Sequence, residues 1–319
     1  MTGRWIDKAC IVGLGPHALN KLIPALQANG QEIAAVVTSR SESPVAGARR
    51  FSRLDEACRA LPPEVVFIVA SPPLAHFAQA EVILGSGHDV FMEKPAFATV
   101  KEVESIAELC NRQGVVLLEG FMHRHAAAYE RLVAYWRAHA GDIDMLTSKF
   151  LIPEMKPGSF RDEPSIASSI VYDIGCYPIS LLVDLDAGEA DLEIVDAAHA
   201  GNQAKERVRI AGRSGPLAID IEIGMADAYA NWVELRCGTG ETFRVQPFFY
   251  GRPGARTVVA AGHSETVDEG NAFERMFRLS REDLVMSQQA RFRAMAAATG
   301  LLASLGTELQ LARWRARRG

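Results

Sequence analysis

The chain has 319 residues, of which 48% are hydrophobic and 23% are charged, a composition that suits a globular protein with a large core and excludes a disordered one. The formal net charge of −5 excludes the broad basic surface that nucleic-acid binding requires. The sequence contains no apolar run of about 18 residues and no signal-peptide pattern, so we expect no membrane contact and a cytoplasmic location.

Five cysteines are scattered without a CxxC pair, which predicts reduced thiols and neither a disulfide framework nor a zinc site. No other grouping of His, Asp or Glu residues suggests a metal ion. We therefore predict no metal.

Up to about residue 122, short apolar runs alternate with helical patterns, as in βαβ units that build a parallel sheet. Fully buried parallel strands are continuously apolar, which lets them be located directly. The predicted strands are Ala9–Val12, Ile33–Val37, Val65–Ala70, Val90–Met92 and Val115–Leu118. Helices are predicted around Leu19–Leu26 and Val100–Cys110, the second ending at Gly114.

The first strand leads into a glycine turn, Gly13-Leu14-Gly15-Pro16-His17-Ala18, and then a helix. Gly13 permits the tight turn, Gly15 lets backbone amides approach a phosphate, and Ala18 lets the helix pack close to the strand. This order of elements predicts a dinucleotide site, because a glycine pattern elsewhere in a chain is often an incidental loop.

The second strand runs into Thr38-Ser39-Arg40, where an NAD enzyme would place an acidic residue on the ribose. A guanidinium suits a 2′-phosphate instead, so Arg40, helped by Ser39, predicts NADP as the cofactor. The alternative is an exposed loop arginine without a ligand.

Beyond residue 122 the pattern changes to one amphipathic helix around Tyr129–Trp136 and then to segments of period two. The clearest is Leu217–Ile223, whose alternation predicts a strand of an antiparallel or mixed sheet with one wet face. Further strands are expected around Val208, Ile210, Val233, Leu235, Phe243 and Val245. Helix is expected from about Ala272 onward, and Gly251–Ala261 is predicted to be an exposed loop. The end of the last helix is predicted to be solvated, because it carries Arg313, Arg315, Arg317 and Arg318.

These patterns predict an α/β protein with a doubly wound parallel Rossmann domain over residues 1–122 and an α+β domain over residues 123–319. The second domain carries a large open, mostly antiparallel sheet and is expected to bind the substrate and to oligomerise.

Several motifs follow in order: the glycine turn, Ser71-Pro72-Pro73 with His76, Glu93-Lys94-Pro95, and Asp173-Ile174-Gly175-Cys176-Tyr177. This succession resembles the glucose-fructose oxidoreductase, inositol dehydrogenase and MocA family over most of the chain. The segments Glu119–His125, Phe160-Arg161 and Pro164 look most like its dihydrodiol dehydrogenase branch, in which a tyrosine replaces the usual catalytic histidine. That tyrosine falls here on Tyr177.

The resemblance implies that the active site lies between the two domains, with Lys94 and Tyr177 flanking the reacting carbon and Asp173 on a substrate hydroxyl. It also places Pro72, Lys94 and Arg124 at the nicotinamide end. The positions predicted to contact the cofactor are Gly13, Gly15, Pro16, His17, Ala18, Ser39, Arg40, Ser71, Pro72, His76, Glu93, Lys94 and Arg124.

The residue types fit reduction of a carbonyl, because the alkoxide that forms needs a proton donor. A tyrosine phenol has a pKa of about 10, which a nearby ammonium lowers. The alternatives are a buried core phenol for Tyr177 and a surface lysine for Lys94. For His76, a place near the nicotinamide and a first-turn helix histidine held by backbone groups both remain open; His123 and His125 are expected to be structural.

The predicted activity is NADP-dependent hydride transfer at a carbonyl or carbinol carbon of a sugar, ketosugar or cyclic diol. Reduction of an imine, in an apolar pocket near Phe248, Phe249 and Tyr250, and a non-catalytic NADP-binding regulator are the alternatives. Ala167-Ser168-Ser169 stands where relatives carry glycines, which leaves the substrate open. By analogy, a homodimer or homotetramer is expected.

Overall fold

The structure is a computed structural model that describes residues 4–41, 45–153, 169–199 and 205–316. Two compact units are present. The first comprises Met1–Phe121 with Phe273–Ala296, and the second comprises Met122–Ala272 with Ala297–Gly319. The final helix therefore contributes its first part to one unit and the remainder to the other.

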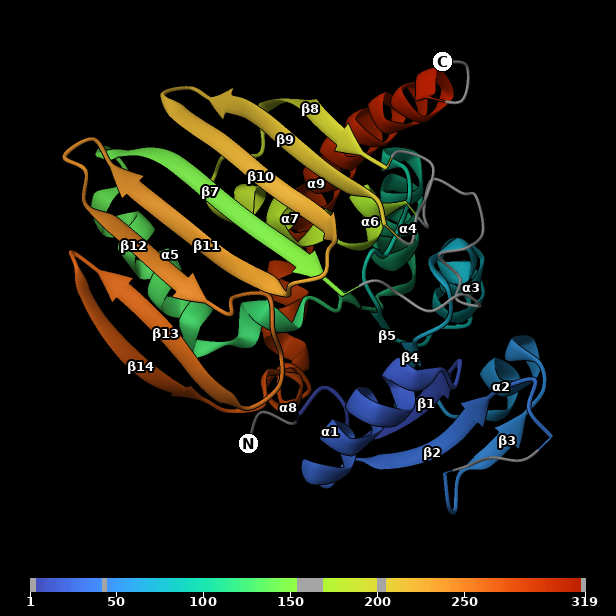
Figure 1. The fold of residues 1–319 in the computed structure, drawn as a ribbon. Coiled ribbons are helices and arrows are strands. Elements are labelled where there is room, and N and C mark those ends of the chain that lie inside the picture. Colours follow the sequence, from blue (N-terminus) through green and yellow to red (C-terminus); the bar gives the residue numbers. More distant parts are fainter. Residues whose placement is uncertain (1–3, 42–44, 154–168, 200–204, 317–319) are drawn as a thin grey trace. The chain divides into compact units, whose positions relative to one another are not determined.

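The first unit contains a six-stranded parallel sheet of order β3-β2-β1-β4-β5-β6 (Figure 1). Its strands are β1 (Lys8–Val12), β2 (Glu32–Val37), β3 (Arg49–Phe51), β4 (Val65–Val69), β5 (Val90–Met92) and β6 (Leu117–Glu119). The order reverses direction between β1 and β4, which is where open α/β sheets hold ligands. The predicted Rossmann fold and its apolar strands are confirmed, whereas the short, charged β3 was not predicted.

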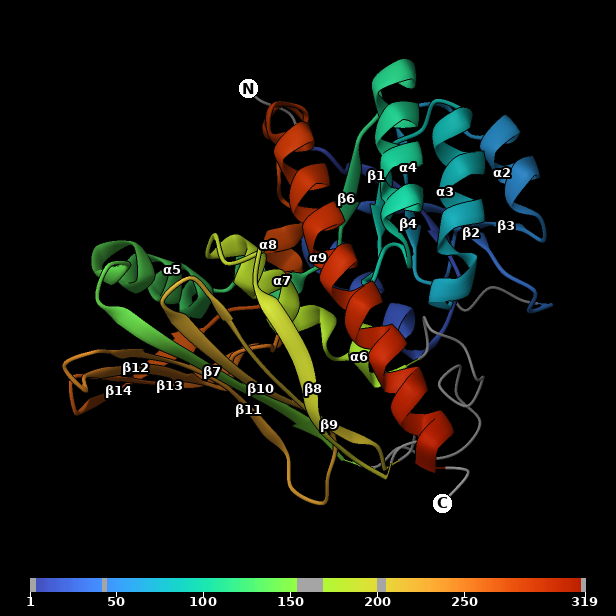
Figure 2. The ribbon, with the colours of Figure 1, turned by 90° about the horizontal axis from the view of Figure 1, so that it is seen from above.

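The helices of this unit cover the sheet. They are a π-helical segment (Ala18–Leu22), α1 (Ile23–Ala28), α2 (Leu54–Ala60), a 3-10 turn (Pro73–Ala75), α3 (His76–Gly85), α4 (Val100–Gln113), α8 (Ala272–Met276) and the first part of α9 (Arg281–Ala316). Figure 2 shows α2, α3 and α4 side by side. Helix α4 begins with a capping box between Thr99 and Glu102, and Gly114 ends it at a φ of 66°.

The second unit contains an eight-stranded sheet of order β14-β13-β12-β11-β7-β10-β9-β8. Only the pair β7–β10 is parallel, so the predicted large, mostly antiparallel sheet is confirmed. Its strands are β7 (Ile143–Ile152), β8 (Asp191–Ala198), β9 (Arg207–Ser214), β10 (Leu217–Met225), β11 (Ala230–Cys237), β12 (Thr242–Gln246), β13 (Gly254–Ala260) and β14 (His263–Glu269). The alternation predicted for β10 is present, because Leu217, Ile219, Ile221 and Ile223 are buried.

One face of this sheet carries helices α5 (Ala127–His139), α6 (Ile170–Asp173) and α7 (Cys176–Asp184), as Figure 2 shows. A 3-10 turn, Met122–His125, precedes α5. None of the helices in the described part of the chain has the length and apolar character that a membrane crossing requires.

Two sequence-based expectations for this unit are wrong. The segment Gly251–Ala261 is not an exposed loop, because it contains β13, and Arg256 within it is only 1% exposed. Arg313 is not solvated either: its guanidinium binds both carboxylate oxygens of Glu206, whose side chain is fully buried. A buried carboxylate needs such a partner, and the helix-end pattern gives no sign of it.

Candidate active site

The glycine turn passes close to the end of the neighbouring strand β4. Gly13 has a φ of 88°, and a Cβ placed on it would lie 3.0 Å from the backbone nitrogen of Ser71. Any other residue would be strained in both respects. A Cβ on Gly15, in contrast, would meet nothing within 4 Å, so the backbone at Gly15 borders open space.

His76 joins two of the predicted segments. It is 1% exposed, and its two ring nitrogens each lie 3.0 Å from a backbone carbonyl oxygen, that of Ser71 and that of Pro95. Burial lowers the pKa of His76, although the carbonyls and the charge of Glu93 oppose this shift. A neutral imidazole carries one N–H, so His76 donates to one of the two carbonyls at a time.

His17 and Glu93 are hydrogen-bonded beside the glycine turn. The Nε2 atom of His17 lies 3.0 Å from Oε1 of Glu93, and the His17 ring packs edge-on against Phe273. Burial raises the pKa of Glu93, but its contact with His17 and the nearby positive charge of Lys94 outweigh this effect and hold that pKa below its ordinary value. Glu93 is therefore ionised at neutral pH.

Lys94 is the second residue after β5 and is half-buried. The chain after it is held by Glu119 at the end of β6, whose carboxylate accepts a hydrogen bond of 2.8 Å from the backbone N–H of Ala96. The first unit thus gathers the predicted residues that follow β1, β4 and β5 at one edge of its sheet. Glu119 was not predicted to have this role.

Ser39 and Arg40 are exposed just beyond β2. The backbone N–H of Arg40 donates to Oγ1 of Thr38 at 3.2 Å, and the carbonyl oxygen of Arg40 accepts a bond of 2.7 Å from Nε of Arg50 on β3. Arg50 is a charged neighbour of Arg40 that was not predicted from the sequence, because β3 was not predicted.

The Asp173 motif in the second unit has a steric basis. Asp173 ends α6 and Tyr177 is the second residue of α7; both are buried, at 3% and 8% exposure. A Cβ on Gly175 between them would lie 2.4 Å from the carbonyl oxygen of Val171, so this position requires glycine. The turn at Ile174 and Gly175 separates the two helices that carry Asp173 and Tyr177.

Tyr177 belongs to an aromatic cluster. Its ring centroid lies 5.3 Å from that of Phe150, 5.5 Å from that of His123 and 5.7 Å from that of Phe249. Its hydroxyl donates to the sulfur of Met122 at 3.6 Å, a weak interaction because a thioether is a poor acceptor. Phe248 and Phe249, which the imine alternative assigned to a pocket, are each 1% exposed and pack in this cluster.

Arg124 forms a bidentate ion pair with Asp184, with distances of 2.8 Å and 3.0 Å. The hydroxyl of Tyr129 donates to the same carboxylate at 2.9 Å. The pair uses Nε and one terminal nitrogen of Arg124. The motif residues Phe160, Arg161, Pro164, Ala167 and Ser168 lie outside the described residues.

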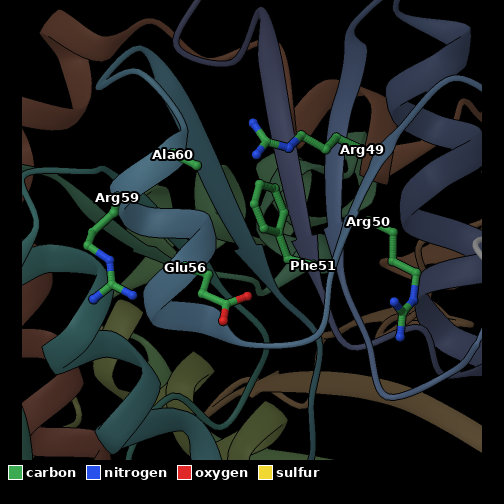
Figure 3. A pocket seen from close by; sticks show the side chains of 6 residues that line it. All are labelled: Arg49, Arg50, Phe51, Glu56, Arg59 and Ala60. Carbon is green, nitrogen blue, oxygen red and sulfur yellow. The ribbon is translucent and has the colours of Figure 1, made fainter.

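Two surface hollows lie apart from the predicted residues. One, of about 510 Å³, is lined by Arg49, Arg50, Phe51, Glu56, Arg59 and Ala60 of β3 and α2 (Figure 3). The other, of about 440 Å³, lies on the large sheet, where Lys149 pairs with Glu222 and Arg209 with Asp220. Within the described residues, no three His, Cys, Asp or Glu side chains are grouped as metal ligands.

Comparisons with known proteins agree with this fold. Residues 8–121 match the GFO_IDH_MocA family, described as an oxidoreductase family with an NAD-binding Rossmann fold. The D-xylose 1-dehydrogenase (NADP(+)) 2 of Haloferax volcanii is 29% identical over 178 residues, which cover 53% of this chain and 54% of that protein. The dTDP-3,4-didehydro-2,6-dideoxy-alpha-D-glucose 3-reductase of Streptomyces violaceoruber is 28% identical over 178 residues, covering 54% and 52%. The chain thus matches about half the length of these curated relatives.

Solved structures match over nearly the whole chain. A 3-ketoreductase from Actinomadura kijaniata in complex with NADP and TDP-benzene has a TM-score of 0.78 at 18% identity, covering 95% of this chain and 98% of that one. An aldose-aldose oxidoreductase from Caulobacter crescentus complexed with glycerol has a TM-score of 0.79 at 16% identity, covering 97% and 98%. At these identities the likeness establishes the fold.

Proposed function

We propose that this chain belongs to the GFO_IDH_MocA oxidoreductase family, whose model matches residues 8–121, and that it is an NADP-dependent enzyme that transfers a hydride at a carbonyl or carbinol carbon of a sugar, ketosugar or cyclic diol. The observation that carries the proposal is the grouping of the glycine turn with Ser71, His76 and Glu93 at the carboxyl edge of the parallel sheet. Ligands of open α/β sheets bind at this edge.

The residues present fit a dinucleotide. The open space at Gly15 leaves room for a pyrophosphate against the backbone amides that begin the first helix. Gly13, Pro16, His17 and Ala18 complete this turn, while Ser71, Pro72 and His76 follow β4 beside it.

A preference for NADP rests on Arg40 and Ser39, which stand exposed beyond β2 where an acidic residue would select NAD. A guanidinium binds phosphate with paired hydrogen bonds. Its positive charge attracts the 2′-phosphate, whereas an acidic residue at this position would repel it. Two proteins similar to this chain carry NADP in their names or structures, which supports the same choice.

A bound nicotinamide would supply or accept the hydride. We propose that the Tyr177 hydroxyl exchanges the proton with the substrate oxygen and that the Lys94 ammonium favours the phenolate. Asp173, four residues before Tyr177 in the sequence, would orient a substrate hydroxyl. The rings around Tyr177 fix its orientation, and its hydroxyl lies 3.6 Å from the sulfur of Met122, a poor hydrogen-bond acceptor.

Turnover across a substrate panel tests the proposal. Purified protein with NADPH or NADH would be assayed against ketosugars, diketones and cyclic imines, and with NADP⁺ against sugars and cyclic diols. We expect turnover on oxygen substrates and a lower KM for NADPH than for NADH. Turnover of imines alone would establish imine reduction, and binding of NADPH without turnover on any substrate would establish a regulator.

Tyr177→Phe should lower kcat by about 10² to 10⁴, the usual share of a general acid, with the Kd for NADPH nearly unchanged. Tyr135→Phe, which removes a hydroxyl that contacts Cys237 in the same unit, is the matched control and should leave kcat within about twofold. Equal activity of the Tyr177 variant and the wild type would remove Tyr177 from the mechanism.

We also propose that the protein is cytoplasmic, a location that suits its five free thiols, and that it forms a homodimer or homotetramer.

A further inference from the structure

The register of the strands determines which face of the parallel sheet carries Arg50. Strand β3 pairs with β2 so that Arg50 is opposite Val36, which is in turn opposite Ile11 on β1. Neighbouring side chains in register share a face of a sheet. The buried cluster on the other face contains Cys10, Val12, Ala35, Val37 and Phe51 together with residues of α2, α3 and α4. Ile11, Val36 and Arg50 therefore lie on the face opposite α2, α3 and α4.

The Arg50 side chain reaches the segment that carries the proposed phosphate ligand. Its Nε donates to the carbonyl oxygen of Arg40 at 2.7 Å, and the backbone N–H of Arg40 is held by Thr38. This bond uses Nε of Arg50, and the Arg50 side chain is exposed. Two exposed arginines thus lie next to each other beyond the end of β2, joined through the Arg40 backbone.

We propose that Arg50 is a second specificity residue, which binds the 2′-phosphate of NADP together with Arg40. The inference rests on the proposed NADP-dependent function. A ribose phosphate monoester carries close to two negative charges at neutral pH, more than one guanidinium neutralises. A second planar guanidinium, oriented by its bond to the Arg40 carbonyl, supplies further charge-assisted hydrogen bonds without a large ordering cost.

Arg49 provides a matched control from the same strand. It is also exposed and lies opposite Ala35, so its side chain is on the other face, where its guanidinium stacks 4.5 Å from the ring centroid of Phe51. In Figure 3 the Arg49 side chain lies with Phe51, whereas the Arg50 side chain points away from both. Replacing either arginine removes one positive charge from the edge strand, so general electrostatic effects on an anionic ligand are similar.

Binding of adenosine 2′,5′-bisphosphate and of 5′-ADP, measured by calorimetry without substrate or turnover, tests the inference. For Arg50→Ala we expect affinity for the 2′-phosphorylated ligand to fall by about tenfold to hundredfold and affinity for 5′-ADP to change less than about twofold. Arg49→Ala should leave the ratio of the two affinities near the wild-type value. Arg50→Gln, which retains a polar side chain, should behave as Arg50→Ala and guards against a local folding defect.

An unchanged affinity ratio in both Arg50 variants would overturn the inference while leaving the proposed enzyme intact. Equal weakening of both ligands would also overturn it, because it would indicate a general disturbance of the nucleotide site. If the wild type bound both ligands equally, the proposed NADP preference itself would fail, and the role of Arg50 would fail with it.

Discussion

His123 illustrates a single buried group whose protonation is tied to folding. It is fully buried among the rings of Tyr129, Tyr177, Phe248 and Phe249. Burial, with the charges of Arg124 and His125, lowers its pKa well below the ordinary value of about 6.5. His123 is therefore neutral in the folded protein, as expected for a structural histidine.

This shift predicts a loss of stability on acidification. Below about pH 6.5 the unfolded chain binds a proton on this histidine and the folded chain does not, so stability rises with pH in this range. At pH 5.5 the loss from His123 is on the order of 1 kcal/mol relative to pH 7.5. His123→Phe should remove that part of the difference between the two unfolding free energies measured in urea. His263→Gln, at an exposed position on β14, should retain it, and an unchanged pH dependence in His123→Phe would contradict the assignment.

Individual site residues were predictable where a strand fixes their place. The residues after β1, β4 and β5 had to meet at one edge once those runs were recognised as parallel strands. The pairing of His17 with Glu93 was not predictable, because it joins residues 76 positions apart through side-chain conformation. The meeting of Lys94 and Tyr177 remains a prediction that the Tyr177→Phe experiment addresses.

At the scale of elements, Asp89 connects β5, β6 and α9 in the first unit. Its buried carboxylate accepts hydrogen bonds from the indole of Trp5 at 2.9 Å, the backbone N–H of Val116 at 2.8 Å and the guanidinium of Arg281 at 2.7 Å. Asp89 therefore links the sheet to the start of α9, because the hydrogen bond from Arg281 to its buried carboxylate is charge-assisted.

Asp89→Asn should lower the free energy of unfolding of the first unit by about 2–3 kcal/mol. The amide removes the charge that Arg281 binds and replaces one acceptor oxygen by a donor facing other donors. The exposure of Arg281 keeps the effect below that of a fully buried pair. Glu282→Gln, the same change at an exposed neighbouring position on α9, should alter stability by less than about 0.5 kcal/mol in urea titrations. Equal effects of the two changes on the free energy of unfolding would show that the Asp89 carboxylate does not stabilise the first unit in this way.

The elements that escaped prediction lack an apolar pattern. Strand β3 reads Arg-Arg-Phe, and β13 follows a segment rich in glycine and proline. What holds β13 in place is Arg256, whose buried guanidinium donates to the carbonyl oxygens of Tyr250, Arg252, Gly254 and Ala255. A charged residue that satisfies backbone carbonyls is indistinguishable in sequence from one that faces water.

At the scale of the whole molecule, the chain returns to its first unit after completing the large sheet. The sequence predicts a single domain boundary, after residue 122. Helical periodicity near the end of the chain does not indicate which hydrophobic core a helix packs against. The structure places Phe273–Ala296 in the first unit. Phe277 packs on Phe91 with ring centroids 5.1 Å apart, Phe292 and Met295 enter the core cluster, and Gln288 bonds the backbone of β6 and of Val115 before it.

This return predicts that residues 1–122 expressed alone do not form a stable domain. Loss of Phe277, Phe292 and Met295 removes about 1.5–3 kcal/mol of burial each, and the Asp89 carboxylate loses Arg281, which together approach the whole stability of a typical domain. Joining residues 272–296 to that fragment through a flexible Gly/Ser linker should restore a cooperative thermal transition and binding of NADPH. A linked control in which Phe277, Phe292 and Met295 are changed to Ser separates packing from added length. If the 1–122 fragment melts cooperatively at the same temperature as the linked one, the returning segment does not stabilise the first unit, and the single division read from the sequence would suffice to define it.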